Sequence, residues 1–242
     1  MVDLFGDTNP VIYLWHVLGI VATCVLIYVS RFEPSIMWIY FVFLFCNIAG
    51  IFGYLFGWFE QLTYASSDWD QSEDSPQEVT KYVGVALGVL VVISAVVSVW
   101  IQEGYTLLWV PRELVPLSLG SSVFLTLFIG LLGTWGAVVP GEEGMKVALS
   151  ATFKGYEFLN LDVPFFLHPA RLFAGAGWGM LHIILGQNAW PFFLSCFFGG
   201  MLWDFCSARC GTLLVGYVTH GIFNTIILVV TFILSLGITV LW

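Results

Sequence analysis

Long runs of apolar residues without a charged side chain dominate this sequence. The longest, Thr212 to Trp242, extends over 31 residues. As a helix it would be about 46 Å long, more than a ~30 Å hydrocarbon core, so we expect it to tilt or to break near Gly237. Charged residues make up 10% of the 242 residues, against about a quarter in soluble domains. Such a chain cannot cover a water-facing surface, and we predict an integral membrane protein.

The apolar runs predict an all-α architecture, a polytopic transmembrane bundle of about eight spans. The expected spans are Val11–Val29, Ile36–Phe59, Tyr82–Ile101, Leu114–Val139, an amphipathic segment from Glu142 to about Leu161, Arg171–Gly186, Trp190–Phe205 and Thr212–Trp242. We expect one integral membrane domain over residues 1–242. Residues 1–113 contribute N-terminal spans with an acidic loop at 60–81, and residues 114–242 form a core that carries the polar motifs.

The distribution of charge restricts the partners of the chain. Its net charge is −9, and most of the acidic excess lies in the loop from Glu60 to Lys81. No basic patch is present, so we expect no nucleic-acid partner. The five cysteines form neither a CxxC metal pair nor a disulfide framework. We therefore expect the lipid bilayer as the main partner, a multi-pass location in the cell membrane, and both termini outside the cytoplasm by the positive-inside rule.

The stretch PGEEGMK places three charged residues between two apolar runs. Pro140 and Gly141 are expected to end the preceding span, so that the two acids begin a new helix, where its dipole favours them. Glu142 and Glu143 project about 100° apart, so only one can point squarely at a given target. Lys146 lies within reach of either. A capped helix start with a local ion pair would explain the same residues.

Two further motifs place polar side chains on apolar spans, where an ionisable residue usually marks function. WGMLH puts Trp178 and His182 four residues apart, and HGIFN does the same for His220 and Asn224. Each pair lies on one helical face. Packing histidines, or hydrogen bonds that hold helices together, would explain them equally. Asp204, beside Arg209 near the end of its span, is interpreted as an interface residue.

Together these motifs contain the kinds of side chain that a hydrolase uses for catalysis. Two carboxylates, two imidazoles and a carboxamide on three spans are satisfied only if those spans converge. A desolvated glutamate beside a histidine is a base that can activate water. A second histidine with an asparagine one turn away offers donors to a developing oxyanion. Glutamate and histidine also bind zinc, but the sequence contains no HExxH pair.

The order EEGMK, WGMLH, HGIFN resembles the CAAX protease and bacteriocin-processing family of intramembrane glutamate-dependent proteases. The resemblance covers roughly Gly141 to Leu228. It implies that Glu142 activates water, that His182 helps to position this water, and that Glu143 orients its neighbour. It also implies an oxyanion site formed by His220 and Asn224, with no metal cofactor. The expected substrate is a membrane-associated peptide or protein.

The chain departs from the family's pattern at two positions. The first motif of the family usually reads EExxxR, and Val147 occupies the arginine position, whereas Lys146 stands one residue earlier. Trp178 replaces a phenylalanine that is commoner in the family. The lysine variant leaves the substrate open among prenylated CAAX peptides, bacteriocin leader peptides and membrane-anchored regulators.

Two other classes of function fit the same residues. One is a catalytically silent binding, assembly or immunity protein that uses the same fold with a membrane-protein partner. The other is a transporter or proton-coupled channel in which Glu142, His182 and His220 relay protons. The absence of internal repeats and of paired broken helices argues against transport.

Overall fold

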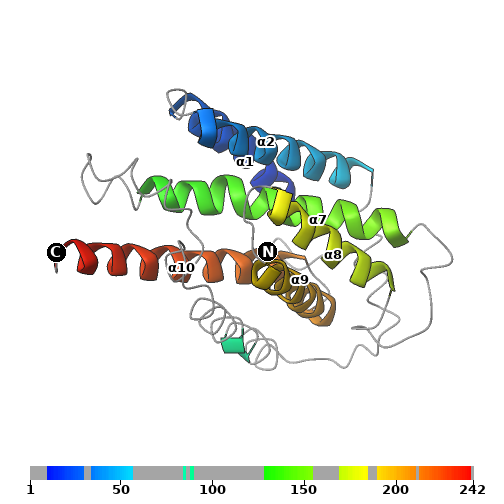
Figure 1. Cartoon of the computed structure of the whole chain (residues 1–242). Coiled ribbons are helices and arrows are strands. Elements are labelled where there is room, and N and C mark those ends of the chain that lie inside the picture. Colours follow the sequence, from blue (N-terminus) through cyan, green and yellow to red (C-terminus); the bar gives the residue numbers. More distant parts are fainter. Residues whose placement is uncertain are drawn as a thin grey trace, which may run out of the picture.

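The computed structural model describes residues 10–29, 34–56, 84–85, 88–89, 128–154, 169–184, 190–210 and 213–240, and this part of the chain is almost entirely helical (Figure 1). Its elements are α1 (Pro10–Val29), α2 (Pro34–Leu55), the π-helix η1 (Leu132–Val138), α7 (Val139–Lys154), α8 (Pro169–Ile184), α9 (Trp190–Cys210) and α10 (Leu214–Val240). The all-helical prediction is confirmed for these residues. The acidic loop 60–81, nearly all of the expected span 82–101 and the segment 155–161 lie outside them.

Helices α1 and α2 are apolar on the outside and carry polar groups on the inside. Over Pro10–Tyr28 and Met37–Leu55, both are long and apolar enough to cross a membrane. Exposed apolar residues recur every three or four positions along each helix; they are Leu14, Leu18, Val21, Val25 and Tyr28 on α1, and Trp38, Phe41, Phe45, Ile48, Phe52 and Leu55 on α2. His16, Thr23 and Asn47 are fully buried on the opposite faces. This arrangement is the reverse of a water-soluble helix pair.

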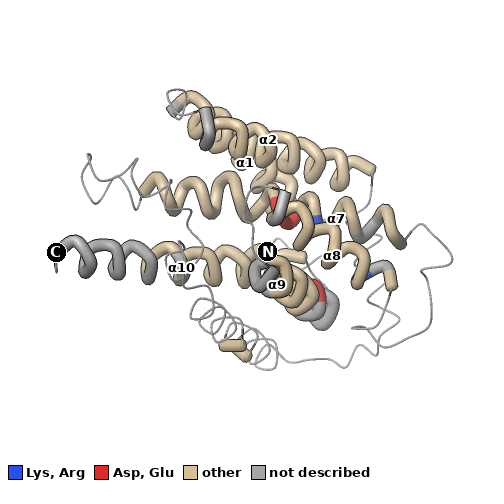
Figure 2. Tube along the Cα trace, in the orientation of Figure 1, with Lys and Arg blue, Asp and Glu red and all other residues tan. Residues whose placement is uncertain are grey.

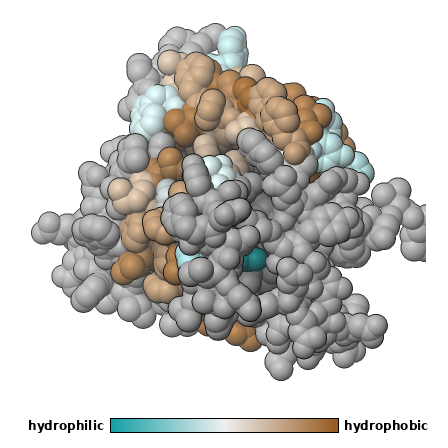
Figure 3. Space-filling model, turned by 90° about the vertical axis from the view of Figure 1, so that its right-hand side faces the viewer, coloured by the Kyte–Doolittle hydropathy of each residue, from teal (hydrophilic) through white to brown (hydrophobic). Residues whose placement is uncertain are grey.

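Charged residues are concentrated on a few helices. Helices α1, α2 and α10 contain no Asp, Glu, Lys or Arg, as Figure 2 shows for their described residues. Figure 3, turned by 90° from Figure 1, shows an apolar surface where α1 and α2 lie at the top of the molecule. The charges of the described helices are instead carried by α7, α8 and α9.

The predicted break at Pro140 is wrong, because residues 128–154 form one continuous helical run. A proline within a helix leaves a carbonyl of the preceding turn without a donor. Here the turn before it is π-helical, and the amide of Val139 donates to the carbonyl of Thr134 five residues back. The next bond of this pattern would join residue 140 to Trp135, which Pro140 cannot make.

Side chains from the N-terminal hairpin satisfy carbonyls of this irregular turn. The indole nitrogen of Trp15 donates to the Trp135 carbonyl at 2.7 Å. The amide nitrogen of Asn47 donates to the Ala137 carbonyl at 3.0 Å. The helix therefore continues past Pro140 because α1 and α2 supply donors, and Glu142 and Glu143 lie within the run rather than at a free helix start.

Helix α7 occupies the centre of the described helices. It contacts α1, α2, α8 and α10, while α9 packs against α8 and α10. Its approach to α2 depends on small residues: a Cβ added at Gly144 would lie 2.7 Å from the His16 ring and 3.0 Å from the Gly50 Cα. Such close packing of helix backbones is typical of membrane helix interfaces.

The C-terminal helices differ from the expectation at their ends. Helix α9 continues to Cys210, through residues that we expected to form a connector after Phe205. Helix α10 runs without interruption through Gly237 to Val240, so of the two expected alternatives, a tilt or a break, the break does not occur. Glycine lowers helix propensity by only about 1 kcal/mol, which the surrounding apolar helix tolerates.

Candidate active site

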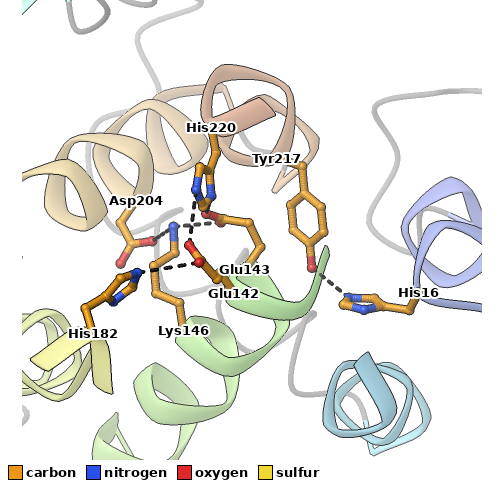
Figure 4. A network of polar contacts seen from close by, with 8 residues as sticks. All are labelled: His16, Glu142, Glu143, Lys146, His182, Asp204, Tyr217 and His220. Carbon is orange, nitrogen blue, oxygen red and sulfur yellow. Dashed lines mark hydrogen bonds and ion pairs between the residues drawn. The ribbon is translucent and has the colours of Figure 1, made fainter. Parts of the chain in front are cut away.

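Glu142 lies between two imidazoles from different helices (Figure 4). Its Oε1 is 3.5 Å from Nε2 of His182 on α8, and its Oε2 is 3.3 Å from Nε2 of His220 on α10. The side chains of both histidines are at least nine-tenths buried, and that of Glu142 is 13% exposed. Three helices thus bring one carboxylate and two imidazoles together within the bundle.

Glu143 contacts the other ring nitrogen of His220 and links it to two further charged residues. Its Oε1 lies 2.9 Å from Nδ1 of His220, and its Oε2 lies 2.7 Å from Nζ of Lys146. The same ammonium is 3.1 Å from Oδ1 of Asp204 on α9. The side chains of Glu143 and Lys146 are both 3% exposed. Lys146 therefore bridges two carboxylates that belong to different helices.

These contacts determine how many protons the cluster must hold. An ionised carboxylate and an unprotonated ring nitrogen are both acceptors, so a hydrogen bond between them requires a proton. His220 faces Glu142 and Glu143 with its two ring nitrogens. Three carboxylates face one ammonium and two imidazoles. With all three carboxylates ionised and both imidazoles neutral, the net charge of the cluster is negative by two. Two additional protons on these groups would make the cluster electrically neutral.

The backbone of α8 sets the orientation of His182. Its Nδ1 lies 2.9 Å from the carbonyl oxygen of Trp178, which is only an acceptor. Nδ1 must therefore carry a proton, and Nε2 is the atom presented to Glu142. The buried thiol of Cys196 on α9 is a further hydrogen-bonding neighbour of this histidine. The spacing of Trp178 and His182 thus fixes which ring nitrogen is available for chemistry.

Aromatic rings enclose the two imidazoles. The indole of Trp203 stacks on His220 with a centroid distance of 4.0 Å and lies 5.5 Å from Nζ of Lys146. The indole of Trp178 meets His182 edge-on at 4.7 Å and His220 at 6.0 Å. Both indoles are almost completely buried. They shield the charges from the surroundings and strengthen the electrostatic interactions among them.

No family model matches the chain. No curated protein and no solved structure matches it either. The interpretation of the site therefore depends on its own geometry.

A second buried polar cluster lies beside the first and was not predicted. Nε2 of His16 is 2.8 Å from the hydroxyl of Tyr217, and Nδ1 is 3.3 Å from Oδ1 of Asn47. The amide nitrogen of Asn47 donates to the carbonyls of Phe43 and Ala137. Its Oδ1 is thus the acceptor, Nδ1 of His16 carries the proton, and Tyr217 donates to Nε2. This cluster connects α1 and α2 to α10 one turn before His220.

Most of the predicted site residues come together in space. The described helices gather Glu142, Glu143, Lys146, Trp178, His182 and His220. Asn224 lies one turn beyond His220 on α10, and within the part of the chain that the structure describes its side chain makes no hydrogen bond or ion pair. Its oxyanion role stays a prediction. In the described ranges, no group of three or more His, Cys, Asp or Glu side chains is arranged to hold a metal ion.

Asp204 and Trp203 are site residues that the sequence interpretation missed. Asp204 was predicted at the membrane interface, but it pairs with Lys146 inside the cluster. The sequence did contain a signal for Asp204, namely an acidic residue in an apolar span. Such a residue needs a partner of opposite charge, and Lys146 on another span can provide it. Trp203 carried no motif, and only the packing of α9 against α10 identifies it.

Proposed function

We propose that the chain is a multi-pass integral protein of the cell membrane. The exposed apolar stripes of α1 and α2, with His16 and Asn47 buried behind them, support this proposal. In water such stripes would be unpartnered, whereas lipid tails cover them without cost. The eight-span bundle remains part of the proposal, with two helices of the described residues long and apolar enough to contribute.

We further propose that the protein is an intramembrane glutamate-dependent endopeptidase of the kind that its three motifs resemble. One observation carries the proposal: both oxygens of the buried Glu142 face Nε2 atoms of histidines from other helices. A structural ion pair needs one partner. A general base needs neighbours that hold its carboxylate in position and stabilise the change in its charge when it takes a proton. The expected substrate is a membrane-associated peptide or protein, and the mechanism requires no cofactor.

The proposed reaction is the addition of water to a peptide carbonyl. Glu142 takes one proton from the water, and the hydroxide adds to the carbonyl carbon. The C–N bond then breaks, and the proton passes from Glu142 to the departing amine. The contact between Glu142 and His182 is 3.5 Å, longer than the 2.7–2.9 Å of a direct charged hydrogen bond, and we place the reacting water beside it.

Identification of new protein N-termini by mass spectrometry tests this function and requires no candidate substrate. Membranes from cells that encode the chain would be compared between wild type and Glu142→Gln at equal protein levels. We expect a set of cleavage products that depends on Glu142, with the rate about 100- to 10,000-fold lower in the variant. His182→Ala should lose the same products. Identical N-termini in wild type and both variants would overturn the proposal.

Cys196→Ala separates this mechanism from thiol catalysis. Because Cys196 neighbours His182, a thiolate nucleophile would use the same imidazole as its base. The proposal expects the Cys196→Ala variant to keep cleaving, since water is the nucleophile. Loss of cleavage in this variant, with the fold intact, would indicate that the Cys196 thiol is the nucleophile.

A silent binding or assembly protein is the second candidate function. The observation that favours it is that Glu142, Glu143, Lys146 and Asp204 each have an ion-pair partner within the chain. Such a network can serve only to hold helices together. In that case Glu142→Gln would change the recovery of a co-purified membrane partner, and no new N-termini would depend on Glu142.

A further inference from the structure

Two buried indole nitrogens beside the candidate active site have no hydrogen-bond acceptor. Among the described residues, Nε1 of Trp178 and Nε1 of Trp203 are fully buried and unpaired. Two other indoles of the described helices have acceptors: Trp15 donates to a carbonyl at 2.7 Å, and Trp135 donates to Thr225 at 2.8 Å. A buried tryptophan N–H normally finds a partner, so two orphans in one place need an explanation.

Both unpaired indoles pack against the imidazole of His220. The ring of Trp203 stacks on it with an interplanar angle of 15°, and the ring of Trp178 meets it at 90°. The two indoles also contact each other edge-on, with centroids 5.6 Å apart. Both indoles are therefore neighbours of an imidazole whose Nε2 faces Glu142 at 3.3 Å.

A glycine on α9 determines how Trp178 sits. A Cβ at Gly200 would be 3.1 Å from Cε3 of the Trp178 ring, closer than ordinary packing allows. The ring edge that carries Cε3 and Cζ3 thus rests on the helix backbone at Gly200. Nε1 is on the opposite edge of an indole, so the donor points away from Gly200.

Apart from the amide of Asn224, whose oxyanion role stays a prediction, the other donors of the cluster are already occupied. His220 directs both ring nitrogens at carboxylates, and His182 directs Nδ1 at a carbonyl of its own helix. Lys146 lies between two carboxylates. A substrate oxygen that becomes negative during the reaction needs donors that are not committed elsewhere. In the described part of the site, the two indoles are such donors.

We propose that the indole N–H groups of Trp178 and Trp203 form a donor pair for the carbonyl oxygen of the scissile peptide bond. The inference rests on the proposed function and deepens it. An indole N–H is only a donor, so its ligand must be an acceptor. The indoles are neutral, so they add no charge to a buried site whose carboxylates already face an ammonium and two imidazoles. The oxygen gains negative charge as water adds, and the two hydrogen bonds strengthen at that step.

Phenylalanine replacements remove the donors and keep aromatic rings in place. For Trp178→Phe and Trp203→Phe we expect kcat to fall about tenfold to 100-fold on a peptide found by the N-terminal comparison, with KM little changed. Thermal stability should not fall by the cost of a lost hydrogen bond, because none is lost. The matched control is Trp15→Phe, which removes a satisfied donor and should lower stability without lowering kcat. Wild-type kcat in both site variants would overturn the inference while the proposed function stands.

Indole NMR tests the donors without turnover. The full-length protein, labelled with ¹⁵N at the tryptophan indoles, would be titrated in detergent micelles with a hydrophobic tripeptide aldehyde. Signals missing from Trp178→Phe and Trp203→Phe assign the two resonances. We expect both to shift on addition of the aldehyde, while the Trp15 resonance stays in place. Unmoved site resonances would overturn the inference. Shifts of both in a protein that cleaves nothing would support the donor pair and defeat the proposed function.

Discussion

Lys146 links two carboxylates of the cluster that come from different helices. It holds Glu143 of its own helix at 2.7 Å and Asp204 of α9 at 3.1 Å, and it is 3% exposed. Removing one partner of a buried pair leaves charges without compensation, at a cost of about 3–5 kcal/mol. We expect Lys146→Met to lower the free energy of unfolding by about this amount, as measured by denaturation in detergent micelles.

The double variant Lys146→Met, Asp204→Leu is the control for this prediction. It removes the ammonium together with one of the two stranded carboxylates, so it should be more stable than Lys146→Met alone. Together with the single variant Asp204→Leu it closes a double-mutant cycle, which measures the coupling between the two side chains. Destabilisation equal to the sum of the two single variants would show that the Lys146–Asp204 pair contributes nothing.

The partners of individual residues were predictable only where they lie close in sequence. The i, i+3 spacing of Glu143 and Lys146 predicts their ion pair, and the structure has it. That Asp204 would be the second partner depends on how α9 packs, which no local pattern contains. The same holds for Tyr217 and His16, on helices at opposite ends of the chain. Helical periodicity identifies which residues share a face, but not which faces meet.

The irregular turn before Glu142 shows how a helix boundary inferred from proline fails. The rule that proline ends a helix assumes that the freed carbonyl finds no other donor. Here the π-helical turn pairs the Val139 amide with the Thr134 carbonyl, and the indole of Trp15 supplies the donor to the Trp135 carbonyl that Pro140 lacks. A sequence pattern could not reveal this, because the donor comes from a helix 120 residues away.

A double-mutant cycle tests the link between Pro140 and Trp15. Trp15→Phe leaves the Trp135 carbonyl without its donor and should cost about 1–3 kcal/mol of stability. In a Pro140→Ala background the alanine amide can donate to that carbonyl, so the same substitution should cost clearly less. Thermal unfolding of the four proteins measures both values. Equal costs in the two backgrounds would contradict our account of the turn.

Gly144 on α7 and Gly133 on η1, both in the continuous helical run 128–154, are a pair of glycines for testing its packing. A Cβ at Gly144 would press on the His16 ring and on the backbone of α2, whereas at Gly133 the nearest neighbour is 3.8 Å away. We expect Gly144→Ala to destabilise the protein by about 1–3 kcal/mol through overpacking. Gly133→Ala should be neutral or stabilising, because alanine has the higher helix propensity. Similar stabilities of the two variants, measured by denaturation, would contradict the close approach of α2 and α7.

The molecule as a whole is organised around α7. The N-terminal hairpin packs on one side of it, and α8 and α10 pack on the other, as Figure 1 shows. Glu142, Glu143 and Lys146 of α7 face α8, α9 and α10, while its glycines face α2. The hairpin, for which the sequence offered only hydrophobicity, thus supports the helix that carries Glu142. This role could not be predicted, because no sequence motif indicates which glycine of α7 packs against which residue of a helix far away in the sequence.

The depth dependence of charge tolerance tests whether the apolar face of α1 meets lipid. Leu18 and Tyr28 are both well exposed on α1, Leu18 near its middle and Tyr28 near its end. A lysine costs about 3 kcal/mol at the centre of a membrane helix and much less near the interface, where its side chain reaches water. We therefore expect Leu18→Lys to reduce the fraction of protein that resists alkaline carbonate extraction from membranes, and Tyr28→Lys to resemble wild type. On a water-facing helix both substitutions would be harmless, and complete extraction of the wild-type protein would remove the membrane assignment itself.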